Sequence, residues 1–133
     1  MKFVYDSLFF VFLFLKGLTS KKKFIILIPK FLAKFFKKII IFNKINNNFF
    51  KQYVRDNHDI NTVYEIFGNE DYDITKYNQW NLIKNKDNHK IPLILDCGAN
   101  IGSSAQFFYQ HFSNSKIVCV EPEKKIMNKS KKI

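Results

Sequence analysis

The stretch at residues 92–104 reads PLILDCGANIGSS, and it decides the fold. Its apolar run, LIL, ends in Asp96, and a loop containing Gly98 and Gly102 follows at once. A continuous apolar run is typical of a buried parallel strand, because helices cover both faces of such a sheet. Glycine lets the backbone turn sharply and approach a ligand closely. Strand-loop-helix units bind ligands beyond the carboxyl end of the strand, so we expect a binding site here.

A second strand is predicted one helix later. Residues 116–120 read KIVCV and end in Glu121, and Pro122 stops the run. Between the strands, Ser103 and Gln106 have the spacing of a capping box, which predicts the start of a helix. The distance from Asp96 to Glu121 suits one βαβ unit of roughly 30 residues. The predicted fold class is therefore α/β.

Residues 30–42 show the clearest helical periodicity in the chain. At about 100° per residue, lysines gather on one arc and apolar side chains on the other. The lysines are Lys30, Lys34, Lys37 and Lys38, and the apolar residues are Phe31, Leu32, Phe35, Phe36, Ile39 and Phe42. The pattern predicts one amphipathic helix. Its apolar face either packs on the domain beneath solvated lysines or attaches to an anionic membrane surface.

The net charge of +11 is unevenly distributed over the 133 residues. Residues 1–51 carry +10, residues 52–123 carry −4, and residues 124–133 carry +5. Since the candidate site lies in the acidic middle, the charge argues against nucleic acid as its partner. We predict a basic amphipathic helical segment at 1–48 and one domain at 49–133.

The two cysteines, Cys97 and Cys119, lack metal-ligand spacing, and no metal site is predicted. They are interpreted as small apolar residues in a reducing compartment. The apolar runs at 8–15 and 24–28 are too short to span a membrane. The expected location is the cytoplasm, with the membrane periphery as a second setting.

The segment between these regions contains three further expectations. The Asn-rich stretch at 43–48 predicts a connector, and a strand is expected at 49–55. Asp59 suits the N-cap of a short helix, and Gly68 suits the residue just after its end.

Three nucleotide-like ligands compete for the glycine loop. A P-loop requires Gly-Lys-Ser/Thr, which is absent. A dinucleotide fingerprint, Gly-x-Gly-x-x-Gly, requires three glycines. Counted from Gly98, the second and third positions are occupied by Asn100 and Ser103, so the match fails at both. S-adenosylmethionine fits better, because it has no phosphate to be repelled by Asp96 and carries two cationic centres. Glu121 is placed to accept hydrogen bonds from ribose hydroxyls, as an acid does in the related fold.

The two motifs together resemble the S-adenosylmethionine-dependent methyltransferases of the FkbM family. The resemblance is carried by ILDCGANIGSS at 94–104 and KIVCVEPE at 116–123, and it covers about residues 50–128. The family's lead-in segment is resembled more weakly, by Arg55, Asp59, Glu65, Ile66, Phe67 and Tyr72. The resemblance implies a partial Rossmann-like class I methyltransferase fold. By position, it implies that the methionine end of the cofactor is lined by Asp96, Gly98, Asn100 and Gly102, and that Glu121 holds the ribose.

The implied reaction is methyl transfer to a hydroxyl of a glycan or small molecule. No catalytic base is identified, since nothing singles out one of His58, Asp59 and Tyr72. Only two strands of the seven that the resemblance implies are evident, so we expect an N-terminal fragment, inactive alone, with partly exposed strand residues. The alternative is a small basic protein of the membrane surface without catalysis.

Overall fold

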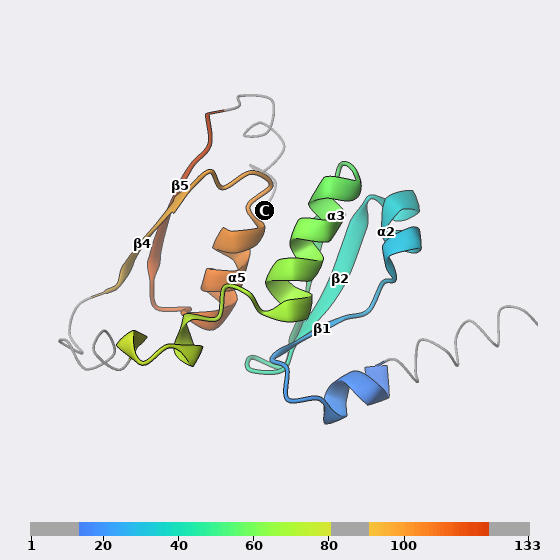
Figure 1. Ribbon diagram of the computed structural model, residues 1–133, viewed down its shortest axis with the longest axis horizontal. Helices are drawn as coiled ribbons and strands as arrows, with labels where there is room; N and C mark the ends of the chain where they lie inside the picture. Colours follow the sequence, from blue (N-terminus) through green and yellow to red (C-terminus); the bar gives the residue numbers. More distant parts are fainter. Residues whose placement is uncertain (1–13, 81–90, 123–133) are drawn as a thin grey trace, which may run out of the picture. The chain divides into compact units, whose positions relative to one another are not determined.

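The computed structural model describes residues 14–80 and 91–122 (Figure 1). The chain divides into two compact units, Met1–Glu70 and Asp71–Ile133. The first is built on an antiparallel sheet and the second on a parallel pair of strands. The fold is therefore mixed α/β, as the sequence predicted at this level.

The N-terminal unit contains a three-stranded antiparallel sheet in the order β1-β2-β3. Its strands are β1 (Phe24–Ile26), β2 (Lys38–Asn43) and β3 (Asn48–Tyr53), and helix α2 (Lys30–Phe36) connects the first two. β2 and β3 pair along their full lengths as a hairpin. The predicted domain boundary after residue 48 lies inside this hairpin. The units divide after Glu70 instead, because backbone hydrogen bonds join β3 to the N-terminal sheet.

The prediction of one amphipathic helix over residues 30–42 was wrong. α2 ends at Phe36, Lys37 takes a left-handed conformation with φ 53°, and the chain continues as β2. Ile39, Ile40 and Ile41 are β-branched residues, which favour strands. Pairing with β1 on one side and β3 on the other adds ladder hydrogen bonds that a continued helix would forgo.

The predicted connector at 43–48 is a tight hairpin turn. The side chain of Asn43 is fully buried, and its Oδ1 accepts a hydrogen bond of 2.9 Å from the backbone N–H of Ile45. Asn47 takes a left-handed conformation, which asparagine tolerates better than most residues. Asparagine is therefore used here for the turn itself.

After β3, α3 (Asn57–Val63) passes directly into a π-helical segment, η1 (Tyr64–Asn69). Asp56, and not Asp59, is the N-cap: its Oδ1 accepts from the backbone N–H of Asp59 at 3.0 Å. Glu70, and not Gly68, is the left-handed residue that ends the segment. The end of the segment lies beyond Gly68 because the π-helical turn extends the helix.

Three phenylalanine rings form the centre of the N-terminal core. Phe24 on β1, Phe50 on β3 and Phe67 on η1 contact one another, with centroid distances of 5.2–6.3 Å. Edge-to-face and tilted aromatic pairs of this kind add to the stabilisation from apolar burial. The Glu70 carboxylate also accepts hydrogen bonds from the backbone N–H groups of Lys23 and Phe24. The helical segment is thereby fastened to the first strand.

The C-terminal unit contains the βαβ arrangement that the sequence predicted. β4 (Leu93–Cys97) pairs in parallel with β5 (Lys116–Val120), and α5 (Ser103–His111) lies between them in sequence and packs against β5. A short 3₁₀ helix, η2 (Ile74–Lys76), precedes them. The register pairs Asp96 with Cys119, so the two strands end side by side.

One face of this parallel pair is open. Leu93, Leu95, Val118 and Val120 are between 47% and 63% exposed, although they belong to the apolar runs of the two strands. Side chains alternate between the faces of a sheet, so Ile94 and Ile117 lie on the opposite, more protected face. The expected partial exposure of the strand residues is thus found on this one face.

Burial predicts sharply different mutational effects in the C-terminal unit. Phe107→Ala removes a fully buried ring and should lower the free energy of unfolding by about 3–5 kcal/mol. Leu95→Thr changes a side chain that is 63% exposed and should alter it by roughly 0.5 kcal/mol or less. Urea unfolding followed by Trp80 fluorescence reports on this unit, because the Trp80 ring lies 5.1 Å from that of Phe112. Equal losses in the two variants would contradict the burial pattern.

Over residues 14–80 and 91–122, no helix combines the length and the apolar character that crossing a membrane requires.

Candidate functional site

The loop after β4 contains three residues with positive φ. Gly98 has φ 82°, Asn100 has φ 48° and Gly102 has φ 79°. Glycine adopts this region at little cost, and asparagine is among the few other residues that visit it routinely. The alternation of these residues in the sequence therefore reflects a backbone requirement of the loop.

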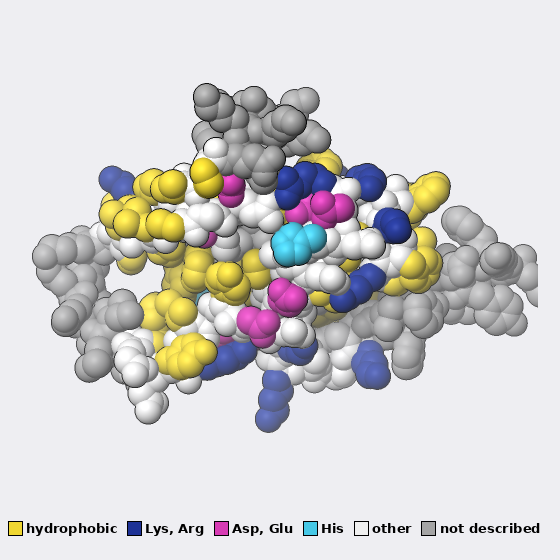
Figure 2. Space-filling model, turned by 45° about the horizontal axis from the view of Figure 1, so that its top comes forward, with side chains coloured by type: hydrophobic (Ala, Val, Ile, Leu, Met, Phe, Trp, Pro, Cys, Tyr) yellow, Lys and Arg dark blue, Asp and Glu magenta, His cyan; other side chains and the backbone are white. Residues whose placement is uncertain are grey.

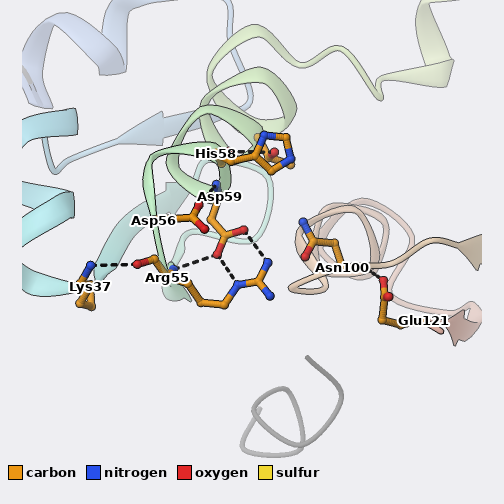
Figure 3. Close-up of polar contacts among 8 residues, drawn as sticks. Lys37, Arg55, Asp56, His58, Asp59, Asn100 and Glu121 are labelled. Atoms are coloured by element: carbon orange, nitrogen blue, oxygen red, sulfur yellow. Dashed lines mark hydrogen bonds and ion pairs between the residues drawn. The ribbon is translucent and has the colours of Figure 1, made fainter. Parts of the chain in front are cut away.

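Hydrogen bonds fasten this loop to the end of β5. The backbone N–H groups of Gly98 and Ala99 donate to the carbonyl oxygen of Val120 at 2.7 and 3.2 Å. The N–H of Asn100 donates to Oε2 of Glu121 at 2.8 Å (Figure 3). The acid that follows the second strand is thus bonded directly to the loop that follows the first.

Asp96, the last acid before the loop, is bonded to the first turn of α5. The hydroxyl of Ser104 donates to Oδ2 of Asp96 at 2.6 Å. The capping box expected from Ser103 and Gln106 is absent, because Gly102 is the N-cap and makes no side-chain bond. Ser103 is instead buried, and its Oγ has no hydrogen-bond partner among the described residues. A buried hydroxyl of this kind is costly unless a partner is supplied.

The space beside the glycines is open. A Cβ placed on Gly98 or Gly102 would have no atom within 4 Å. Packing within the described chain therefore does not require glycine at these positions, and the positive φ angles alone account for it. The loop surface is accessible to a ligand that approaches the backbone. This arrangement leaves room for a small molecule over the loop.

The thiol of Cys119 lies on the same sheet face as Asp96, to which it is paired in register. Local burial raises the pKa of Cys119, and the nearby Asp96 carboxylate raises it further. This thiol therefore remains protonated at neutral pH. Since the thiolate is the nucleophilic form, Cys119 is unsuited to nucleophilic catalysis.

The effect of the Asp96 charge on the pKa of Cys119 can be measured by alkylating that thiol at different pH values. In a Cys97→Ala background, the pH midpoint of iodoacetamide labelling should lie above the ordinary thiol value of about 8.5. Asp96→Asn removes the charge that disfavours the thiolate and should lower this midpoint. N-acetylcysteine serves as the reference thiol. An identical midpoint with and without the Asp96 charge would show that the two groups do not interact.

A second polar cluster lies in the N-terminal unit, at the start of α3 (Figure 3). The Asp59 carboxylate is fully buried and accepts from the backbone N–H, Nε and Nη2 of Arg55 at 2.7–2.8 Å. Burial acts to raise the pKa of Asp59, but the hydrogen bonds and charge of Arg55 outweigh it and hold the pKa below its usual value. Asp59 is therefore an ionised structural anchor for Arg55 and a poor candidate for a general base.

This pair predicts a pH-dependent stability. Because the folded-state pKa of Asp59 is lowered, its contribution is present above the unfolded pKa of about 3.9 and is lost as pH falls through the folded pKa. At pH 7, Asp59→Asn should lower the free energy of unfolding by about 1.5–3 kcal/mol, since hydrogen bonds to a charged group are removed. Urea unfolding followed by far-UV circular dichroism measures this difference.

The difference between the wild type and Asp59→Asn should shrink below pH 4, as Asp59 becomes protonated in the wild type. Asp56→Asn is the matched control, because asparagine caps a helix about as well as aspartate does. A difference that is constant from pH 7 to pH 3 would contradict the assigned role.

All five residues predicted for cofactor binding lie where β4 and β5 end: Asp96, Gly98, Asn100, Gly102 and Glu121. Hydrogen bonds join Glu121 to the loop and Asp96 to α5. Sequence reasoning missed Ser104, whose only signal is a hydroxyl at the start of the helix that follows the loop. Across the described residues, no group of three His, Cys, Asp or Glu side chains is placed to hold a metal ion.

Comparison of the chain with models of known protein families, with curated proteins and with solved structures gave no match. The FkbM resemblance therefore stays a prediction, which depends on the residues of the loop and of the second strand.

Proposed function

We propose that the C-terminal unit is the S-adenosylmethionine-binding part of an FkbM-like methyltransferase with a Rossmann-like fold. The observation that carries the proposal is the bond between the Asn100 N–H and Glu121, which joins a glycine loop to the acid after the next strand. This is where open α/β sheets bind ligands, beyond the carboxyl ends of neighbouring strands. The acceptor is proposed to be a hydroxyl of a glycan or small molecule, on the strength of the resemblance alone.

The charges at this edge favour a cation over a phosphate. Asp96 and Glu121 are both at the ends of the paired strands, and the register brings these ends together. Two carboxylates repel a pyrophosphate and attract the ammonium and sulfonium groups of S-adenosylmethionine. The same two acids therefore support S-adenosylmethionine over NAD or a nucleoside triphosphate.

Glu121 has two tasks in this proposal. One carboxylate oxygen accepts from the loop at Asn100, which orients the side chain. A carboxylate has about four lone-pair sites and can accept several hydrogen bonds at once, and we assign the ribose hydroxyls to this side chain. Asp96, oriented by the Ser104 hydroxyl, is assigned to the amino group at the methionine end.

S-adenosylmethionine supplies a methyl group that is already activated by its sulfonium. The residues of this chain hold and orient the donor, and such alignment is a large part of catalysis in group transfer. No residue is assigned as the base that takes the acceptor proton. Asp59 is unsuited, because Arg55 binds both of its carboxylate oxygens.

The exposed face of β4 and β5 suggests which form of the protein turns over substrate. Parallel sheets are normally covered on both faces, whereas Leu93, Leu95, Val118 and Val120 are largely exposed here. A complete Rossmann-like sheet covers such a face with further helices. We therefore assign turnover to an assembly in which this face is covered, and cofactor binding to the loop itself.

Cofactor binding is testable by isothermal titration of the chain with S-adenosylhomocysteine. The wild type should bind, and Asp96→Ala and Glu121→Ala should each weaken binding by about tenfold or more, since each removes a charged hydrogen-bond acceptor. Asp71→Ala is the matched control, because Asp71 is an exposed acid of the same unit outside the site. NADH is titrated in parallel and should not bind.

Three results would contradict the proposal. The first is no heat of binding from a wild type whose circular dichroism shows a folded chain. The second is equal affinity in the two site variants and the wild type. The third is tighter binding of NADH than of S-adenosylhomocysteine, which would indicate a dinucleotide site.

A further inference from the structure

The helix α2 presents aromatic rings outward. Phe31 is 72% exposed, Phe35 is 81% exposed and Phe36 is 51% exposed, whereas Ala33 is fully buried. The rings of Phe35 and Phe36 meet edge-to-face at a centroid distance of 5.5 Å. The sequence left two interpretations open for this apolar face, packing on the domain or attachment to a membrane surface. Because these three rings are exposed, they do not pack on the domain. We call Phe31, Phe35 and Phe36 the aromatic surface of α2.

Lysines accompany the aromatic surface in the sequence. Lys34 lies exposed on the same helix, between the phenylalanines in sequence. Residues 7–55 contain no acidic residue at all. Figure 2 shows lysine and arginine side chains on the face that it presents, with acidic and histidine side chains beside some of them and hydrophobic side chains around them. An anionic partner with an apolar interior complements this combination of exposed rings and an exposed lysine.

Two lysines at the ends of α2 fix the helix to its own unit. Lys30 Nζ donates to Oδ1 of Asn61 at 2.9 Å and lies 4.9 Å from the centre of the Tyr64 ring. Lys37 Nζ donates to the carbonyl oxygen of Arg55 at 2.8 Å. The aromatic surface is therefore held in place before any partner arrives, which reduces the entropy lost on docking.

We propose that α2 is a docking surface for an anionic lipid bilayer. Phe31, Phe35 and Phe36 enter the boundary between headgroups and acyl chains, and Lys34 contacts anionic headgroups. Single-stranded nucleic acid is the other polyanion that binds aromatic and basic residues, by stacking bases on ring faces. The 89° angle between the Phe35 and Phe36 rings does not form a continuous stacking platform, and so favours lipid. This function is independent of cofactor binding in the C-terminal unit.

Vesicle flotation of the whole chain tests the proposal, because aggregated protein does not float. The chain should float with phosphatidylcholine vesicles that contain phosphatidylglycerol and not with phosphatidylcholine alone. Replacing all three phenylalanines of the aromatic surface with serine should reduce partition by about tenfold or more, since apolar burial is lost. Lys34→Gln should reduce it roughly fivefold, and added salt should weaken binding.

Tyr109→Ser is the matched control, because Tyr109 is a 56% exposed aromatic residue on α5. It should float like the wild type, and circular dichroism should show that every variant keeps its helix content. The proposal is overturned if the wild type does not float with anionic vesicles, or if the triple variant floats equally well. Absence of flotation together with binding of a labelled single-stranded oligonucleotide that the triple variant loses would identify nucleic acid as the partner instead.

Discussion

The parallel pairing of β4 with β5 is the constraint on which the candidate site depends. Because the register sets Asp96 beside Cys119 and Cys97 beside Val120, the two strands end together. The loop after β4 can then donate its N–H groups to Val120 and Glu121. The loop that makes those bonds has a left-handed backbone at Gly98, Asn100 and Gly102. The pattern of glycines and asparagine thus suits the backbone angles of the loop that reaches the neighbouring strand.

The N-terminal unit depends on a different local event, the left-handed residue Lys37. It ends α2 after seven residues, and the isoleucines that follow form the central strand β2, which pairs with β1 and with β3. The end of the helix at this point also divides the apolar residues into a buried set and an exposed set. Ile39 and Ile41 become core, whereas Phe31 and Phe35 stay on a short helix outside it. The left-handed conformation of Lys37 therefore precedes the central strand of the sheet and limits the exposed aromatic surface to a short helix.

The two units use their acidic residues in opposite ways. Asp59 is buried, and Arg55 donates hydrogen bonds to both of its carboxylate oxygens, so its charge stabilises the fold. Asp96 and Glu121 are only partly buried and stand at the open ends of strands. A carboxylate at such a position can still meet a ligand, whereas a fully buried and paired one cannot. This contrast supports the choice of the loop, and not the Arg55 cluster, as the candidate site.

Much of the site could be predicted from the sequence, because its signals are local. A continuous apolar run, an acid and alternating glycines specify strand, turn and helix within thirteen residues, and the second strand repeats the first two signals. The helix predicted at 30–42 failed because periodicity cannot separate a helix from a short apolar strand, and pairing with β1 and β3 decides between them. Likewise, the cap of α3, the bond from Ser104 to Asp96 and the outward rings of α2 depend on neighbours distant along the chain or on backbone angles. Sequence alone therefore determined the βαβ unit and its loop. Tertiary structure decided which apolar residues were buried, because burial depends on the partners that each segment finds.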